Sequence, residues 1–330
     1  MSVQVVPLGR SGLKVSRLCL GTMTFGAETD EALAARIGAA ALDAGVFFWD
    51  TADMYSKGRS EEFIGRILGP RRSEVVLATK AFAPMGAGAN DRGLSARHLI
   101  SACEASLRRL QTDWIDLYYL HLPDPGTPLE ETLRAIEDLR RAGKIRYVGC
   151  SNHRAWEAAR LIATAERHGW QPLSATQPVY NLTNRQAEIE IIPMATATGL
   201  GVVTYSPLAR GVLTGKYRWG EPPPGDSRLG RNNPRFLAAE WREASIAVAD
   251  KLSGAVPLAR LAQAWVLANP QVTAMIAGPR TMAHWEESLA ATRLTWDPSF
   301  ESAVDVLVPP GTFTGRDVPD PAYYPVTGRR

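Results

Sequence analysis

Eight short apolar segments alternate with helical patterns along nearly the whole chain, and this alternation limits the fold more than any other feature. The segments are rich in β-branched and aromatic residues, and they span residues 17–23, 46–52, 74–80, 115–122, 145–152, 173–181, 201–208 and 272–278. Between them, apolar residues recur every three or four positions, which is typical of amphipathic helices. Apolar strands that alternate with helices form parallel sheets covered on both faces.

Such a sheet can be open and doubly wound, or closed into a barrel. The open sheet would carry a G-x-G-x-x-G fingerprint directly after its first strand. The sequence there is GTMTFG, and the glycine-rich MGAGAND comes only after the third strand. Eight strand–helix units match the closed form. We therefore predict an α/β protein of the (β/α)8 TIM barrel class, with residues 1–330 forming one domain.

Three segments fall outside the repeating pattern. Residues 1–16 predict an N-terminal hairpin, with a turn at Gly9–Gly12, that plugs the bottom of the barrel. Residues 216–235 form a Pro/Gly/Arg-rich loop after the seventh strand, and two helical patterns, 236–252 and 258–270, follow it. Residues 296–330 extend beyond the last barrel helix. A long loop within a compact domain is usually functional, so we expect 216–235 to lie near a site.

Charge and composition argue against several classes of protein. The net charge is only +3 over 330 residues and no Lys/Arg-rich block occurs, which disfavours nucleic-acid binding and a polybasic membrane contact. No apolar run approaches the ~18 residues of a membrane span, and the N-terminus lacks a secretory pattern. Cys19, Cys103 and Cys150 show neither zinc spacing nor a disulfide framework. We expect a cytoplasmic protein that acts on a small molecule and has no metal; its oligomeric state is not predicted.

Barrel chemistry is located at the carboxyl ends of the strands, and four proton-active side chains fall there. Asp50 ends the second strand in DTADMYSKGRSEE, where Asp53 and Tyr55 follow within five positions. Lys80 ends the third strand and His121 follows the fourth in LHLPD. Each alone has an ordinary interpretation, such as a helix cap or a strand reaching solvent. Together, at the same end of three neighbouring strands, they predict a catalytic site.

These four residue types suit proton transfer to a carbonyl oxygen. A tyrosine has an ordinary pKa of about 10, too high for efficient acid–base catalysis near neutrality. An ammonium such as that of Lys80 favours the phenolate and lowers that pKa, and a carboxylate such as Asp50 holds the ammonium in place. His121 can then stabilise charge on the substrate oxygen. Because no side chain donates hydride, a cofactor must supply it.

Polar residues at the remaining strand ends suggest where that cofactor binds. Ser151, Asn152 and Gln177 suit a carboxamide group, and Tyr205 offers a flat face for a ring. The segments SPLARGVLTGKY and GPRTMAHWEE follow strands seven and eight, where barrels commonly bind phosphates through loop amides and a helix N-terminus.

In combination these motifs resemble one family. LGTMTFG, DTADMYSKGRSEEFIG, LATK, LHLPD, GCSN, QPVYNL, YSPLARGVLTGKY and GPRTMAHWEESLAA occur in order from residue 7 to about residue 295, and they are similar to those of the aldo-keto reductases. The long segment after YSPLARGVLTGKY resembles the bacterial and potassium-channel-β-subunit branch.

The resemblance implies a function and a set of site residues. Family members usually reduce aldehydes or ketones with NADPH, and NADH remains possible. The implied catalytic tetrad is Asp50, Tyr55, Lys80 and His121, with Tyr55 as the general acid in reduction. The implied cofactor residues are Gly21, Thr22 and Met23 near the nicotinamide; Ser151, Asn152 and Gln177 on its carboxamide; Tyr205 stacked on its ring; and Ser206, Leu208, Arg210 and Lys216 on the pyrophosphate, with Gly278 at the end of the eighth strand.

The adenosine end departs from the family pattern. His284 stands where the family commonly has glutamine and Ser288 where it has asparagine, while Glu287 can supply the acid found nearby. Arg280 can pair with a 2′-phosphate, because a guanidinium is well shaped for that group. The resemblance therefore favours NADPH, while the departures leave NADH open.

The substrate side is predicted only by residue type. Met54, Phe82 and Tyr180 are candidates for an apolar wall, together with Met23 and Trp219. The loop 81–95 and the tail 319–330 are further candidates for the mouth.

Two alternatives stay open at this point. A Schiff-base lyase would use Lys80 as a neutral amine, although Asp50 would keep that lysine charged. A regulatory protein would bind the cofactor with little turnover, as the channel-subunit branch suggests.

Overall fold

The computed structural model describes residues 2–315, and all eight predicted barrel strands are present in it. Each is shorter than its apolar run. A two-stranded hairpin precedes them. The strands are β1 (Val5–Pro7), β2 (Lys14–Ser16), β3 (Leu18–Gly21), β4 (Phe48–Asp50), β5 (Val76–Ala81), β6 (Ile115–Leu120), β7 (Ile145–Ser151), β8 (Ala175–Gln177), β9 (Gly201–Thr204) and β10 (Ala274–Ala277).

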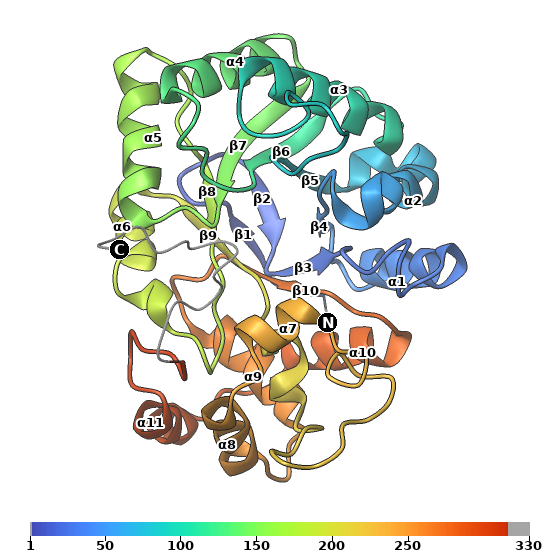
Figure 1. Cartoon of the computed structure of the whole chain (residues 1–330), viewed down its shortest axis with the longest axis vertical. Helices are drawn as coiled ribbons and strands as arrows, with labels where there is room; N and C mark the ends of the chain where they lie inside the picture. The colour runs from blue at the N-terminus through green and yellow to red at the C-terminus, as the bar shows by residue number, and fades with distance from the viewer. Residues whose placement is uncertain (1, 316–330) are drawn as a thin grey trace.

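Strands β3 to β10 close into one parallel barrel in chain order, with β10 pairing back onto β3. The predicted (β/α)8 TIM barrel is therefore confirmed. Figure 1 shows the strands at the centre of the molecule with the helices arranged around them. Because all eight strands run the same way, their carboxyl ends meet at one rim of the barrel.

Several helices begin where the sequence offers a capping side chain. Asp30, Ser95, Asn233 and Thr281 each accept a hydrogen bond from a backbone N–H of the first helical turn, which satisfies a donor that the helix itself cannot. The helices are α1 (Glu31–Asp43), α2 (Arg59–Leu68), α3 (Ala96–Leu110), α4 (Leu129–Arg141), α5 (Ala155–Arg167), α6 (Ile191–Thr198), α7 (Pro234–Ala239), α8 (Glu243–Leu252), α9 (Leu258–Ala268), α10 (Met282–Ala291) and α11 (Pro298–Leu307), with 3₁₀ turns η1 (Tyr55–Gly58), η2 (Gly69–Glu74), η3 (Gln186–Glu188) and η4 (Ala209–Thr214).

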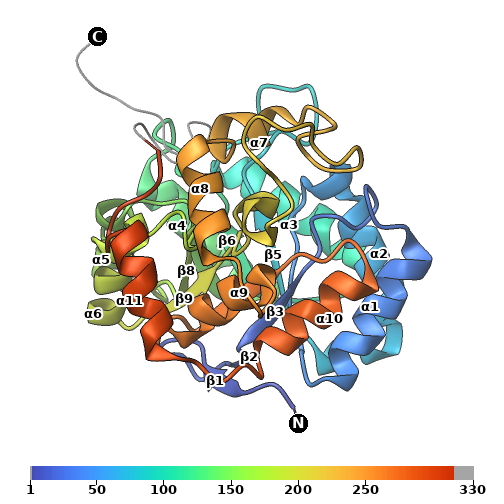
Figure 2. The same ribbon diagram turned by 90° about the horizontal axis from the view of Figure 1, so that it is seen from below.

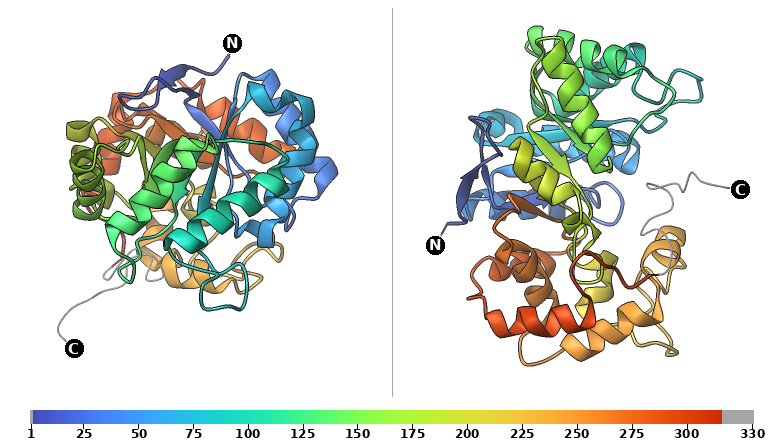
Figure 3. Two further views of the ribbon diagram at one scale, coloured as in Figure 1. Left: turned by 90° about the horizontal axis from the view of Figure 1, so that it is seen from above. Right: turned by 90° about the vertical axis from the view of Figure 1, so that its left-hand side faces the viewer.

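The N-terminal hairpin closes the end of the barrel where the strands begin, as predicted. Leu8 and Val15 are fully buried and belong to the same apolar cluster as the side chains inside the barrel. Gly9 lies directly against the backbone of 199–201, at the start of β9. The right-hand view of Figure 3 shows the hairpin at one end of the barrel. The hairpin does not cover the opposite rim, which is formed by the carboxyl ends of the strands.

The segment after β9 contains the one clear departure from the predicted helices. Residues 215–233 form neither helix nor strand, as expected, and α7 and α8 follow beside them (Figure 2). The pattern over 236–252 is two helices instead of one. The backbone is extended at Arg242 and non-helical at Glu240, whose buried carboxylate lies 3.5 Å from the Arg210 guanidinium. The single helix expected over 236–252 is therefore broken at residues 240–242.

Candidate active site

A cavity of about 640 Å³ opens at the rim formed by the carboxyl ends of the strands. Its volume is in the range of small-molecule and cofactor sites. Twenty of the sequence-predicted site residues line it: Gly21, Thr22, Met23, Asp50, Met54, Tyr55, His121, Ser151, Asn152, Gln177, Tyr205, Ser206, Leu208, Arg210, Lys216, Gly278, Arg280, His284, Glu287 and Ser288. The eight strands therefore bring residues more than 250 positions apart in the sequence to one cavity.

Lys80 lies beneath the cavity and connects two of the groups that line it. It is fully buried, and its Nζ donates to Asp50 Oδ1 at 2.5 Å, to the Thr51 carbonyl at 2.7 Å and to the Tyr55 hydroxyl at 3.2 Å. Burial lowers the pKa of Lys80, but the adjacent Asp50 and Tyr55 outweigh that effect and leave this pKa above its ordinary value. Lys80 is therefore a fixed ammonium, with all three of its N–H donors used.

The backbone that presents Tyr55 is strained. The next two residues, Ser56 and Lys57, have φ of 51° and 56°, and Gly58 has φ of 91°. Left-handed backbone at non-glycine residues is costly and is found mostly at functional sites. Contacts on both sides hold it: the Ser56 hydroxyl donates to the Phe25 carbonyl at 2.9 Å, and Arg109 packs against Gly58. These contacts fix the position of Tyr55.

Tyr55 and His121 line one part of the cavity, which we call the catalytic end. The two side chains face each other there. The two rings are edge to face, with centroids 6.2 Å apart. Burial lowers the pKa of His121 well below its ordinary value, and the charges of Lys80 and Arg235 lower it further. The imidazole is therefore neutral near pH 7, so it can donate a hydrogen bond without carrying charge.

Four predicted residues, Ser151, Asn152, Gln177 and Tyr205, form one hydrogen-bonded cluster beside the catalytic end, in which the Ser151 hydroxyl donates to the Gln177 carbonyl at 2.9 Å. The Asn152 amide donates to the His121 carbonyl and to the Ser151 hydroxyl, both at 3.0 Å. Tyr205 donates its hydroxyl to Asn152 Oδ1 at 2.6 Å. The Gln177 amide donates to Asp50 Oδ2 at 2.9 Å. This last bond connects the cluster to the Lys80 ion pair, a link that the sequence did not predict.

The other part of the cavity is strongly basic, and we call it the basic end. It is formed by Lys216, Arg228, Arg280 and His284, which all line the cavity. Burial lowers the pKa of Lys216, and the charges of Arg280 and Arg228 lower it further. Arg280 also lies 3.8 Å from both Glu28 and Asp226, which offset part of its charge.

Three residues predicted for the substrate side, Tyr180, Phe82 and Trp219, do not line the cavity. Tyr180 is buried in the outer core, where its ring stacks on Trp265 at 4.9 Å and its hydroxyl donates to Glu188 at 2.6 Å. Phe82 packs against the outer core as well. Trp219 is 47% exposed and stacks on Trp241 outside the cavity. For Tyr180 and Phe82, a position near a strand end does not reveal which way the side chain points.

Of the other residues expected at the mouth, Met23 and Met54 line the cavity and are partly exposed. The tail 319–330 lies outside the described residues. Glu287 also lines the cavity, and its carboxylate is bonded to Arg260 at 2.8 Å.

Several lining residues were missed by the sequence analysis. Arg228, Asn233 and Arg235 come from the segment between β9 and α8, and Gln263 comes from α9. The only signal for the first three was the Arg-rich composition of the 216–235 loop, which predicted a functional loop but no individual contact.

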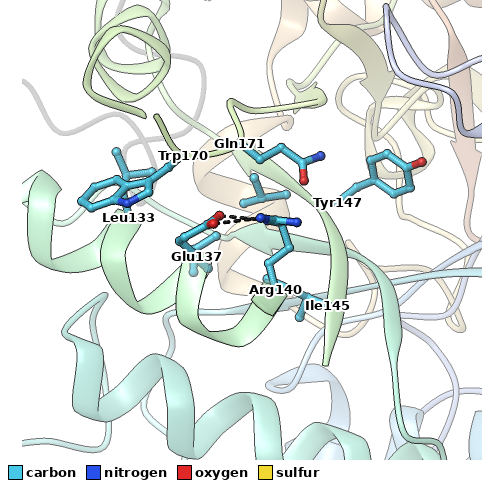
Figure 4. A pocket seen from close by; sticks show the side chains of 9 residues that line it. Leu133, Glu137, Arg140, Ile145, Tyr147, Trp170 and Gln171 are labelled. Atoms are coloured by element: carbon cyan, nitrogen blue, oxygen red, sulfur yellow. Dashed lines mark hydrogen bonds and ion pairs between the residues drawn. The ribbon is translucent and has the colours of Figure 1, made fainter. Parts of the chain in front are cut away.

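A second, much smaller hollow lies on the outside of the barrel, between α4 and β7 (Figure 4). Trp170 and Leu133 form part of its wall, and the Glu137–Arg140 ion pair lies across it. Its volume of about 10 Å³ is of the order needed for one water molecule. It contains no predicted site residue.

Within residues 2–315, no helix is long and apolar enough to cross a membrane. Over the same residues, His, Cys, Asp and Glu side chains do not gather in groups of three or more that could hold a metal ion.

The fold and the site define a class of protein: a (β/α)8 barrel with a buried Lys80–Asp50 ion pair bonded to Tyr55 beneath a cavity at the carboxyl rim. Comparison with known proteins then gives the family. The model of the Aldo/keto reductase family matches residues 17–308, and the chain belongs to this family.

Individual relatives agree with that assignment. The chain is 42% identical over 306 residues to an uncharacterized oxidoreductase, YrpG, of Bacillus subtilis, covering 88% of this chain and 91% of the relative. It is 40% identical over 302 residues to a probable voltage-gated potassium channel subunit beta of Arabidopsis thaliana, with the same coverage. A versiconal hemiacetal acetate reductase of Aspergillus parasiticus is 33% identical over 326 residues, covering 88% of this chain and 93% of the relative.

Proposed function

We propose that the protein is an NADPH-dependent oxidoreductase that reduces an aldehyde or ketone to an alcohol. One observation carries the proposal: Lys80 bonds both Asp50 and the Tyr55 hydroxyl beneath a cavity that His121 also lines. Membership of the aldo/keto reductase family and the presence of a reductase among the relatives support it.

In this proposal Tyr55 gives its proton to the substrate oxygen. The Lys80 ammonium stabilises the phenolate that remains, because the two groups are already within hydrogen-bond distance at 3.2 Å. Asp50 keeps Lys80 charged and immobile. The neutral His121 donates a hydrogen bond to the same substrate oxygen and stabilises the charge that develops on it.

The cavity fits a nicotinamide dinucleotide by its distribution of polar groups. Ser151, Asn152 and Gln177 would hold the carboxamide, and Tyr205 would lie against the ring. The basic end would hold the phosphates, with Arg280 on a 2′-phosphate, which is why we favour NADPH over NADH. When bound, the cofactor supplies the hydride that no side chain can provide.

The alternatives are less well supported. Schiff-base chemistry needs a neutral amine, whereas the pKa of Lys80 is raised and all three of its donors are used. A regulatory role with little turnover has the support of the channel-subunit relative. The turnover measurement below separates that role from the reductase.

The test compares wild-type protein with Tyr55→Phe. Cofactor affinity would be measured by quenching of intrinsic fluorescence with NADPH and with NADH, and turnover by NADPH oxidation with 4-nitrobenzaldehyde. We expect unchanged NADPH affinity and a fall in kcat of about 10²–10⁴-fold, because only the proton donor is lost. Near-normal turnover by the variant would refute the role of Tyr55. Tight binding without turnover of a broad carbonyl panel by the wild type would favour the regulatory alternative.

A further inference from the structure

Glu61 and Arg109 form an ion pair close to Tyr55, and neither residue lines the cavity. Arg109 Nη2 lies 2.7 Å from Glu61 Oε2, and Arg109 Nε donates to the same oxygen at 2.7 Å. Glu61 is fully buried and belongs to the first turn of α2, whereas Arg109 extends from α3. The proposed mechanism gives this pair no role. Its contacts on either side point to one.

On one side, Arg109 covers the turn that presents Tyr55. Gly58 has φ of 91°, and a Cβ added there would lie 2.8 Å from Arg109 Cδ and 3.0 Å from its Nε. The Arg109 side chain therefore lies directly against this backbone. The left-handed conformation of 56–58 is costly and persists only where the surrounding structure holds it. Because Glu61 accepts from Nε, it keeps Arg109 in this supporting position.

On the other side, the same carboxylate anchors the strand that carries Lys80. Thr79 is fully buried, and its hydroxyl donates to Glu61 Oε1 at 2.6 Å. Successive side chains of a strand point to opposite faces, so Thr79 points toward the helices while Lys80 points into the barrel. Strand β5 is therefore tied to α2 at the residue next to Lys80.

We propose that Glu61 and Arg109 are positioning residues, which set the distance between the Tyr55 hydroxyl and Lys80 Nζ. One carboxylate holds Thr79 beside Lys80 and Arg109 beside the Tyr55 turn, so it connects both supports of the 3.2 Å contact. An error of about 1 Å in such an arrangement can lower a rate about 100-fold. This inference rests on the proposed reductase function and adds two residues to those that make it work.

The test compares two double variants, each of which removes an ion pair without leaving a lone buried charge. Glu61→Gln/Arg109→Met removes the pair described above. Arg72→Met/Asp116→Asn is the matched control: Arg72 Nη2 donates to Asp116 Oδ2 at 2.7 Å, both residues are buried, and Asp116 also accepts from the backbone of β5. Asp116 lies near the start of β6, at the end of the barrel opposite Tyr55.

Three measurements distinguish positioning from a general loss of structure. NADPH oxidation with 4-nitrobenzaldehyde gives kcat and KM, and urea unfolding gives the stability of each protein. The ultraviolet absorbance of tyrosinate, after subtraction of the matching Tyr55→Phe protein, follows the ionisation of Tyr55 alone and needs no turnover. Lys80 and His121, which face Tyr55, and Asp50, which pairs with Lys80, are unchanged in every protein compared.

We expect both double variants to lose stability but only Glu61→Gln/Arg109→Met to lose activity. Its kcat should fall by about 10–100-fold, with KM and the affinity for NADPH nearly unchanged. Tyr55 should ionise about one pH unit higher or more, because the Lys80 ammonium no longer stabilises its phenolate. Arg109→Lys keeps the charge without the planar fork, and it should recover part of kcat.

Equal falls in kcat in the two double variants, or an unchanged kcat or Tyr55 ionisation in Glu61→Gln/Arg109→Met, would overturn the inference and leave the reductase proposal standing. If that variant does not fold, Thr79→Val replaces it, because it removes only the bond to Glu61. A smaller fall in kcat with the same change in Tyr55 ionisation would support the inference, and no change in either would overturn it. A shifted Tyr55 ionisation in a protein whose wild type reduces no carbonyl compound would instead overturn the reductase proposal.

Discussion

At the residue scale, the structure shows hydrogen bonds between side chains that could not be predicted from the sequence. Strand-end position predicted Asp50, Lys80 and Gln177 separately, because barrel topology places strand ends at one rim whatever their side chains. That Gln177 donates to Asp50 depends on the register of β4 and β8 and on rotamers. Tyr180 was misassigned for the same reason, because its position in the sequence does not give the direction of its side chain. That side chain points into the outer core.

Arg280 gives the residue-scale test of cofactor preference. Arg280→Ala should weaken NADPH by about 10–100-fold and NADH much less, because only NADPH carries the 2′-phosphate that a guanidinium binds strongly. Dissociation constants from fluorescence titration give both values. Arg231→Ala is the control, because Arg231 also pairs with Glu28 but does not line the cavity. It should change neither dissociation constant. Equal weakening of both nucleotides by Arg280→Ala would show that Arg280 does not bind the 2′-phosphate.

At the element scale, the presence of strands and helices was predictable and their ends were not. The apolar runs gave all eight barrel strands, since a strand buried on both faces has to be apolar throughout. The 236–252 pattern was misread because periodicity cannot show that Glu240 contacts Arg210 on the rim. The hairpin was recognised from its turn, although its close packing on β9 follows only from the folded barrel.

The hairpin contact can be tested with two glycines of the same turn. Gly9 has φ of 57°, and an added Cβ would lie 2.4 Å from the Gly199 carbonyl oxygen and from the Gly201 nitrogen. Gly9→Ala should lower the free energy of unfolding by about 1–3 kcal/mol, because backbone must move to admit the methyl group. Gly12→Ala, where nothing lies within 4 Å, should change it by about 0.5 kcal/mol or less. Urea unfolding measures both, and similar losses would mean that the hairpin is not packed as described.

At the scale of the whole molecule, stability should depend on a carboxyl group behind the site. Asp53 is fully buried, and burial, followed by the charge of Glu61, raises its pKa from 3.8 to about 8. The native state therefore holds a proton that the unfolded chain releases above pH 3.8. It follows that this group lowers the free energy of unfolding as the pH rises from about 4 to about 8.

Asp53→Asn tests this dependence, because the amide mimics the protonated acid and cannot ionise. Its stability relative to wild type should rise across pH 4–8, by up to about 1.4 kcal/mol per pH unit. Urea unfolding at pH 5, 6.5 and 8 would measure it. Burial lowers the pKa of His153 to about 4, so this residue raises the free energy of unfolding as the pH rises. His153 is present in both proteins, and its effect therefore cancels from the comparison. Parallel stability curves would contradict the shift.

The residues of the site come from two different parts of the fold: the barrel strands, and the segment between β9 and α8. The groups proposed for proton transfer lie on barrel strands or within five residues of a strand end. Arg228, Asn233 and Arg235, by contrast, come from a segment that contributes no strand to the barrel. With this arrangement, the segment between β9 and α8 can change in sequence between related proteins while the barrel strands stay the same. Variants with a new choice of substrate would then inherit the acid–base chemistry unchanged.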